Sequence, residues 1–174
     1  RRAPWQQNRH DFLADPLNAR RTAMLLEQLE QIDPPTLLDV GCGAGTLLRM
    51  FAEKNPYCRC TGVDLSPTRP QQHGTPAGIN FLAADARALP LPDNAFDCTV
   101  CSEMLEHLPD PQNALAELRR VLRPGGRLLA TVPNLFCLDS IEGRAGVFLA
   151  AGRALHRAGI TSRFRNGINT HIQK

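Results

Sequence analysis

The sequence lacks long hydrophobic runs, a strong net charge of either sign and, apart from Tyr57, tyrosine. None of its apolar stretches reaches the roughly 18–20 residues that a membrane-spanning helix needs, and Arg1–Trp5 is not followed by the apolar core of a signal peptide. A formal net charge of +3 is too small to indicate a nucleic-acid partner by itself. With 174 residues the chain suffices for one domain, for which we expect a cytoplasmic location and no membrane span. The oligomeric state stays open.

Six cysteines are present, and two of them, Cys98 and Cys101, have the spacing of a metal or redox pair. The run Phe96–Cys101, however, is predicted to be a strand, and positions three apart on a strand face opposite sides. The two thiols therefore cannot share a metal ion. We expect the cysteines to be small, buried side chains that stay reduced.

Segments whose apolar residues have helical spacing alternate with short apolar segments typical of strands along most of the chain. The expected helices are residues 17–32, residues 46–54 and a third that Asp110-Pro111 caps and that runs through Leu122. The expected strands are residues 36–40, 59–63, 79–82, 96–101 and 127–132. This alternation predicts an α/β fold with a doubly wound, mostly parallel sheet and helices on both faces. Ligands bind such sheets beyond the carboxyl ends of the strands.

A glycine-rich loop joins the first expected strand to the helix that follows it. Gly41, Gly43 and Gly45 allow backbone conformations with positive φ and remove side chains that would block a ligand. The helix start adds free N–H groups and the positive end of a dipole, which suit an anionic or polar ligand. By itself the loop also fits a tight strand-to-helix turn with no ligand.

Two acidic residues end the next two strands. Asp64 follows the glycine loop by about twenty residues, where an acid in nucleotide-binding folds accepts hydrogen bonds from both ribose hydroxyls. The alternative is a surface carboxylate that caps the Ser66-Pro67 turn. Asp85 can accept a hydrogen bond from an exocyclic amine while the next backbone N–H, that of Ala86, donates to a ring nitrogen. Such a pair would recognise adenine, although an acid at the end of a strand is common.

Five motifs in sequence order resemble those of class I S-adenosylmethionine-dependent methyltransferases, and they lie at residues 37–46, 62–66, 84–86, 96–97 and 122–127. The resemblance implies a Rossmann-like sheet with strand order 3-2-1-4-5 and S-adenosylmethionine as cofactor. It places the glycine loop at the methionine part, Asp64 at the ribose and Asp85-Ala86 at the adenine. The cofactor-binding residues that we expect are Asp39, Gly41, Cys42, Gly43, Gly45, Asp64, Leu65, Asp85, Ala86 and Glu103.

Residues 101–111, which follow the fourth strand, most resemble the ubiquinone-pathway O-methyltransferases of that family. If this segment is helical, Glu103, Glu106 and His107 share one face. We take His107, as general base, and Glu106 as the candidate catalytic pair. In a second interpretation the three side chains hold a divalent cation, magnesium or manganese, although we expect no metal. In a third they are solvated or cap the next helix.

The chain is expected to divide into an N-terminal helical arm (residues 1–35), a cofactor-binding core (residues 36–134) and a helical lid or insertion (residues 135–174). No strand is evident in the last segment. We therefore expect the hairpin that closes the sheet in this family to be missing and the lid to be truncated. Without a cover, the strand at residues 127–132 would be an exposed apolar edge.

The resemblance implies methyl transfer to a small-molecule acceptor, with oxygen as the favoured target atom. Nucleic-acid methyltransferases use an Asn/Asp-Pro-Pro-aromatic tetrad where this chain has Ser102–Leu105, so we expect no nucleic-acid acceptor. Two alternatives stay open. One is a non-catalytic module that binds S-adenosylmethionine. The other is a nicotinamide-dependent dehydrogenase, whose fingerprint has a third glycine where Thr46 stands.

Overall fold

The computed structural model describes residues 12–66, 78–132, 164–165 and 168–173. Its strands form one seven-stranded sheet with the order β3-β2-β1-β4-β5-β7-β6. The strands are β1 (Thr36–Val40), β2 (Arg59–Asp64), β3 (Ile79–Ala83), β4 (Phe96–Ser102), β5 (Leu122–Thr131), β6 (Phe164–Arg165) and β7 (Ile168–Gln173). Because β1 to β5 pair in parallel, the predicted α/β fold and the strand order 3-2-1-4-5 are confirmed.

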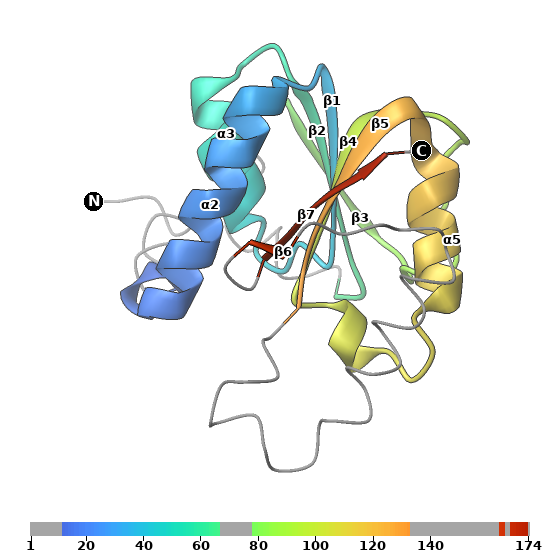
Figure 1. The fold of residues 1–174 in the computed structure, drawn as a ribbon. Helices are drawn as coiled ribbons and strands as arrows, with labels where there is room; N and C mark the ends of the chain where they lie inside the picture. The colour runs from blue at the N-terminus through green and yellow to red at the C-terminus, as the bar shows by residue number, and fades with distance from the viewer. Residues whose placement is uncertain (1–11, 67–77, 133–163, 166–167, 174) are drawn as a thin grey trace.

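Helices cover both faces of the sheet (Figure 1). The helices α2 (Pro16–Ile32) and α3 (Thr46–Lys54) lie on one face, and α5 (Gln112–Val121) lies on the other. The Asp15 carboxylate caps α2 by accepting a hydrogen bond from the Leu17 N–H, and the helix ends at Asp33 in a left-handed conformation. No helix in the described ranges is both long and apolar enough to cross a membrane.

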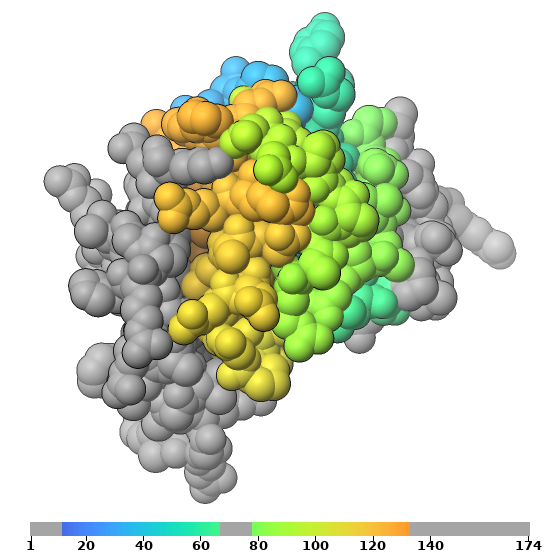
Figure 2. Space-filling model, turned by 90° about the vertical axis from the view of Figure 1, so that its right-hand side faces the viewer, coloured from blue at the N-terminus to red at the C-terminus, as the bar shows by residue number. Residues whose placement is uncertain are grey.

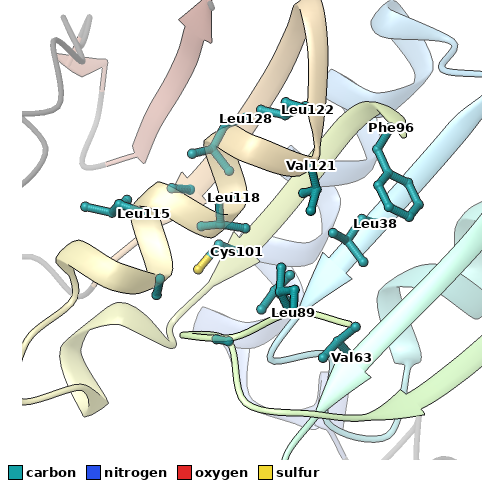
Figure 3. Close-up of a cluster of buried hydrophobic side chains, with 14 of the residues drawn as sticks. Leu38, Val63, Leu89, Phe96, Cys101, Leu115, Leu118, Val121, Leu122 and Leu128 are labelled. Atoms are coloured by element: carbon teal, nitrogen blue, oxygen red, sulfur yellow. The ribbon is translucent and has the colours of Figure 1, made fainter. Parts of the chain in front are cut away.

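Each face of the sheet has its own apolar core. Successive strand residues such as Leu37 and Leu38 face opposite cores, as the pleat of a strand requires. Cys98 and Cys101 also lie in different cores, which confirms that they cannot share a metal ion. Figure 3 shows the core beneath α5, in which Leu115 and Leu118 of the helix meet residues of the sheet. Burial of each such leucine stabilises the fold by about 1.5–3 kcal/mol.

The expectation that the closing hairpin is missing is wrong. The strand β7 pairs antiparallel with β5, and β6 pairs antiparallel with β7. The backbone of β5 therefore has a partner strand on both sides, which removes the exposed edge. The sequence signal is weak because β6 has two residues and β7 reads Ile-Asn-Thr-His-Ile-Gln, which is mostly polar. The rest of the expected lid (residues 135–163, 166–167 and 174) lies outside the described residues.

The boundary between α5 and β5 also differs from the expectation. The helix ends at Val121, and β5 begins at Leu122 rather than after the glycine pair. Leu122 is extended, with φ −72° and ψ 138°, and it pairs with Phe96 of β4. The segment Arg123–Gly126 then shifts the register of this pairing before it resumes at Arg127. A residue with an apolar side chain next to a helical stripe fits either element, so periodicity alone extends the helix by one residue.

Candidate functional site

The glycine loop lies between β1 and α3, at the edge of the sheet where the parallel strands end. We call this edge, which is the lower one in Figure 1, the carboxyl edge. Gly41, Gly43 and Gly45 all have positive φ, at 78°, 54° and 74°. A Cβ at Gly41 would lie 2.8 Å from Met104 Cγ, and one at Gly45 would lie 2.5 Å from Phe81 Cζ. A Cβ at Gly43 would meet none of the described residues within 4 Å, so of the three glycines this one faces open space in the described part of the chain.

Hydrogen bonds hold the loop against the end of β2. The N–H groups of Gly41 and Cys42 both donate to the Val63 carbonyl, at 2.8 and 3.1 Å. The Gly43 N–H donates to Asp64 Oδ2 at 2.9 Å, and the Ser66 N–H donates to Asp64 Oδ1 at 3.0 Å. A carboxylate has about four acceptor positions, so each Asp64 oxygen retains capacity for one more donor beyond those that the described residues supply. The structure therefore joins the first two predicted motifs and leaves Asp64 able to bind hydroxyl groups.

A second carboxyl group, that of Asp39, lies near Asp64 and is almost fully buried. Its residue is 4% exposed, and burial followed by the charge of Asp64 raises the pKa of Asp39 to about 7. The thiol of Cys42 is partly buried in the same region, and burial is the main cause of its raised pKa. This end of the loop is therefore a place where a positive charge on a ligand would be favoured.

Beyond β3, the predicted adenine-binding pair is divided between surface and core. The side chain of Asp85 is about one-third exposed, whereas Ala86 is buried in the core beneath α5. The Arg87 side chain binds Asp85 through Nε and Nη2, and the Arg87 N–H donates to Oδ1 at 2.9 Å. The hydrogen bonds from Arg87 lower the pKa of Asp85 to about 2. A ligand amine would therefore compete with an exposed arginine side chain for this carboxylate. Leu65, beside Asp64, is 72% exposed.

Glu103 marks the end of β4 and is tied to two other elements. Its φ of 51° turns the chain away from the strand, and its Oε1 accepts a hydrogen bond from Thr131 Oγ1 of β5 at 2.9 Å. Its Oε2 lies 3.2 Å from Nη1 of Arg21 on α2, and both side chains are about one-fifth exposed. This arginine was not among the predicted site residues. It precedes the buried Leu25 by four positions, so a charged residue on the buried stripe of the helix is the signal that could have identified it.

The condition under which Glu103, Glu106 and His107 would share a helical face is not met. Only Leu105–His107 are helical, in a single 3₁₀ turn (η1), and the fully buried Leu105 takes the inward position. The side chain of Glu106 is 4% exposed, and its Oε2 is buried without a hydrogen-bond partner among the described residues. Burial raises the pKa of Glu106. His107 is largely exposed, with Nε2 3.7 Å from Glu106 Oε1.

The metal interpretation loses its geometric premise for the same reason. Glu103 is bound to Arg21 and Thr131 rather than aligned with the other two side chains. Within the described ranges, no group of three or more His, Cys, Asp or Glu side chains could hold a metal ion. What η1 does bring together is a buried carboxyl group and an exposed imidazole, which is an arrangement suited to proton transfer.

Comparison with known proteins connects this site to a family. Residues 38–130 match the family model described as a methyltransferase domain. The demethylmenaquinone methyltransferase of Thermus thermophilus is 39% identical over 101 residues, which are 55% of this chain and 46% of that protein. The ubiquinone biosynthesis O-methyltransferase of Pseudomonas fluorescens is 34% identical over 105 residues, which are 56% of this chain and 44% of that protein.

The solved structures give the same fold. A SAM-dependent methyltransferase from Aquifex aeolicus superposes with a TM-score of 0.63 at 22% identity, over 79% of this chain and 81% of that one. At this identity the likeness concerns the fold alone. The chain spans less than half the length of the two curated relatives that it matches.

Proposed function

Since this chain belongs to the methyltransferase domain family, we propose that it transfers a methyl group from S-adenosylmethionine to a small-molecule acceptor. The cofactor of that family is S-adenosylmethionine. The observation that carries the proposal is the Gly43–Asp64 pair at the carboxyl edge. Within the described ranges, the Gly43 backbone faces open space and lies next to a carboxylate with unused acceptor capacity.

The residues at this edge fit the charges and polar groups of the cofactor. Asp64 would accept hydrogen bonds from the ribose hydroxyls, and Asp85 with the Ala86 N–H would bind the adenine. The methionine part carries an ammonium and a carboxylate, and the edge offers groups of both signs in Asp39, Glu103 and Arg21. We assign Arg21 to the methionine end of the cofactor because its guanidinium pairs with Glu103 at this edge. Gly41, Cys42, Gly45 and Leu65 would line the same surface.

The remaining task of the protein is to position the acceptor and to remove a proton from it. When bound, S-adenosylmethionine supplies a methyl group on a sulfonium that is already a strong electrophile, so no covalent help from the protein is required. His107 would take the proton of an acceptor hydroxyl, because its imidazole is exposed at the edge. The positive charge that His107 then gains lies beside Glu106, and it favours the ionised carboxylate of that residue.

For the acceptor we propose a small molecule that is methylated on oxygen. The similarity to a demethylmenaquinone methyltransferase and to a ubiquinone biosynthesis O-methyltransferase supports a small-molecule acceptor, and the name of the second relative supports oxygen as the target atom. We also propose a cytoplasmic location, which is consistent with the free thiols of the five cysteines in the described part of the chain.

Titration calorimetry with S-adenosylmethionine, combined with transfer of a labelled methyl group to phenolic acceptors, tests this proposal. Asp64→Ala should weaken cofactor binding by at least about tenfold, since each lost hydrogen bond to a charged group contributes about 1.5–3 kcal/mol. Glu27→Ala, on the exposed side of α2, is the control and should bind normally. Unchanged binding by the Asp64 variant contradicts the site. Cofactor binding without transfer to any acceptor would favour a binding module, and binding of a nicotinamide cofactor instead would favour a dehydrogenase.

A further inference from the structure

The segment from Ala84 to Ala95, which joins β3 to β4, carries the proposed adenine-binding pair and lies along α5. Figure 2 shows the light-green atoms of this segment directly beside the gold atoms of the helix. We propose that Glu117 and Arg120 of α5 are positioning residues that fix this segment so that Asp85 and Ala86 can recognise adenine. This inference rests on the proposed function. It assigns a role in cofactor recognition to two residues that would not touch the cofactor.

Arg120 binds three successive parts of the segment. Its Nη2 donates to the Leu89 carbonyl at 3.0 Å, and its Nη1 donates to the Leu91 carbonyl at 2.8 Å and to Asp93 Oδ1 at 2.7 Å. A guanidinium has five N–H donors in a fixed plane, so one side chain can fix several acceptors relative to one another. The carbonyl groups of Leu89 and Leu91 therefore have their hydrogen-bond donor on α5 and do not depend on water for one.

Glu117 completes the attachment from one turn earlier on the same helix. Its Oε2 accepts a hydrogen bond from the Leu89 N–H at 2.7 Å, so both backbone groups of Leu89 are bound by α5 side chains. Nε and Nη2 of Arg120 donate to the Glu117 carboxylate, each at 2.7 Å. These hydrogen bonds are the main reason that the pKa of Glu117 lies below its ordinary value. The pair is ionised at neutral pH and acts as one unit.

Apolar anchors determine which way the segment faces. Ala86 and Leu89 are 9% and 5% exposed and lie in the core beneath α5, where Figure 3 shows Leu89 among the sheet residues. Asp85 precedes the first anchor and remains about one-third exposed. The Ala88 N–H donates to the Asp85 carbonyl at 3.0 Å and closes a turn between the two anchors. Displacement of Leu89 would therefore rotate the turn that presents Asp85 and the Ala86 N–H.

This geometry has a consequence for base recognition. Adenine presents an amine donor next to a ring-nitrogen acceptor, which matches a carboxylate followed by an N–H. Hypoxanthine presents an oxygen acceptor next to a protonated ring nitrogen, which reverses both partners. Discrimination between the two bases requires Asp85 and Ala86 to keep a fixed relative orientation, because hydrogen bonds weaken steeply with misalignment. Loosening the segment should reduce this discrimination more than it reduces binding of the rest of the ligand.

The test compares S-adenosylhomocysteine with S-inosylhomocysteine in calorimetric titrations of the whole chain. The wild type should bind the adenine ligand more tightly, and no binding of either ligand would contradict the proposed function rather than this inference. Arg120→Ala should raise the Kd of S-adenosylhomocysteine by about tenfold and change that of S-inosylhomocysteine by less than about twofold. Arg119→Ala is the matched control, since the neighbouring Arg119 is exposed, and it should leave both values unchanged.

Milder variants keep the test decisive if Arg120→Ala does not fold. Arg120→Lys keeps the positive charge but loses the planar set of five N–H donors. Glu117→Gln keeps an acceptor for the Leu89 N–H but loses the negative charge. Both variants should lower the ratio of the Kd of S-inosylhomocysteine to the Kd of S-adenosylhomocysteine, while thermal unfolding stays cooperative. In methyl-transfer assays, KM for S-adenosylmethionine should rise while kcat stays within about twofold. Equal weakening of both ligands, or an unchanged ratio in all three variants, would overturn the inference.

Discussion

Replacement of either Gly43 or Gly45 by alanine should separate cofactor binding from stability, because the two glycines have the same backbone conformation but different surroundings. Both have left-handed φ values, 54° for Gly43 and 74° for Gly45. An added methyl group at Gly43 would meet no atom of the described segments within 4 Å. At Gly45 it would lie 2.5 Å from the ring of Phe81, closer than carbon atoms approach without a shift of one of them. Alanine at Gly45 therefore has to displace part of the core beneath α3, and alanine at Gly43 does not.

The expected losses of stability follow from these contacts. A left-handed conformation costs an alanine roughly 1–2 kcal/mol, and both variants carry this penalty. Overpacking at Gly45 adds about 1–3 kcal/mol, because Phe81 lies over the buried Arg49, whose guanidinium carbon is 5.4 Å from the ring centroid. For a chain of this size each kcal/mol lowers Tm by about 2–4 °C. Gly43→Ala should thus lose a few degrees, and Gly45→Ala about twice as much or more.

For cofactor affinity we expect the opposite order: Gly43→Ala, the less destabilised variant, should lose more affinity than Gly45→Ala. The methyl group of Gly43→Ala extends into the space that we assign to the methionine part of S-adenosylmethionine, so its Kd should rise by about tenfold or more. Differential scanning calorimetry and isothermal titration on both variants give the two quantities independently. Normal cofactor binding by Gly43→Ala would contradict the placement of the methionine part at Gly43, and equal losses of stability in the two variants would contradict the close contact at Gly45.

Other variants test the acids and the histidine. The pKa of Asp39 is about 7 in the folded chain and 3.8 in the unfolded chain, so between these values only the folded chain holds the proton. The free energy of unfolding should therefore fall as the pH rises from about 4 to about 7, by up to about 4 kcal/mol. Asp39→Asn should remove this slope in urea unfolding at several pH values, and parallel curves would contradict the assignment. His107→Ala should lower kcat by about 10²–10⁴-fold with unchanged cofactor Kd. Loss of turnover on addition of a chelator would instead support a metal. Glu106→Gln should retain stability, since Glu106 Oε2 has no partner in the described part of the chain, but lower turnover.

The parallel part of the fold and the positions of its ligand-facing loops could be predicted from the sequence because local signals are strong there. The strand Thr36–Val40 and the helix Thr46–Lys54 lie where periodicity puts them, since apolar runs and glycines mark their ends. The pairing of Gly43 with Asp64 follows from topology, because β1 and β2 are parallel neighbours and end at the same edge. The strand order together with the order of the motifs is therefore enough to predict that Gly43 and Asp64 lie close together.

The missed features depend on contacts between distant residues. Arg21 becomes part of the site only through Glu103, which lies 82 positions later and reaches it by a left-handed turn that no local pattern signals. The sequence Glu103–His107 has helical spacing, but the left-handed Glu103 precedes the single 3₁₀ turn, and Pro109 favours the extended conformation that Leu108 adopts after it. The hairpin of β6 and β7 has little apolar character of its own and is recognised only by its pairing with β5.

Asp39 is the residue whose environment is hardest to explain without a ligand. It is nearly inaccessible, and the charge of Asp64 acts on it in addition to burial, so both effects oppose its ionisation. A leucine or asparagine at this strand position would avoid the repulsion, since the neighbouring strand residues Leu38 and Val40 are apolar and buried. A ligand with a sulfonium and an ammonium would bring positive charge to this edge and favour the ionised form of Asp39. We therefore propose that Asp39 and Asp64 together favour cationic ligands over neutral ones.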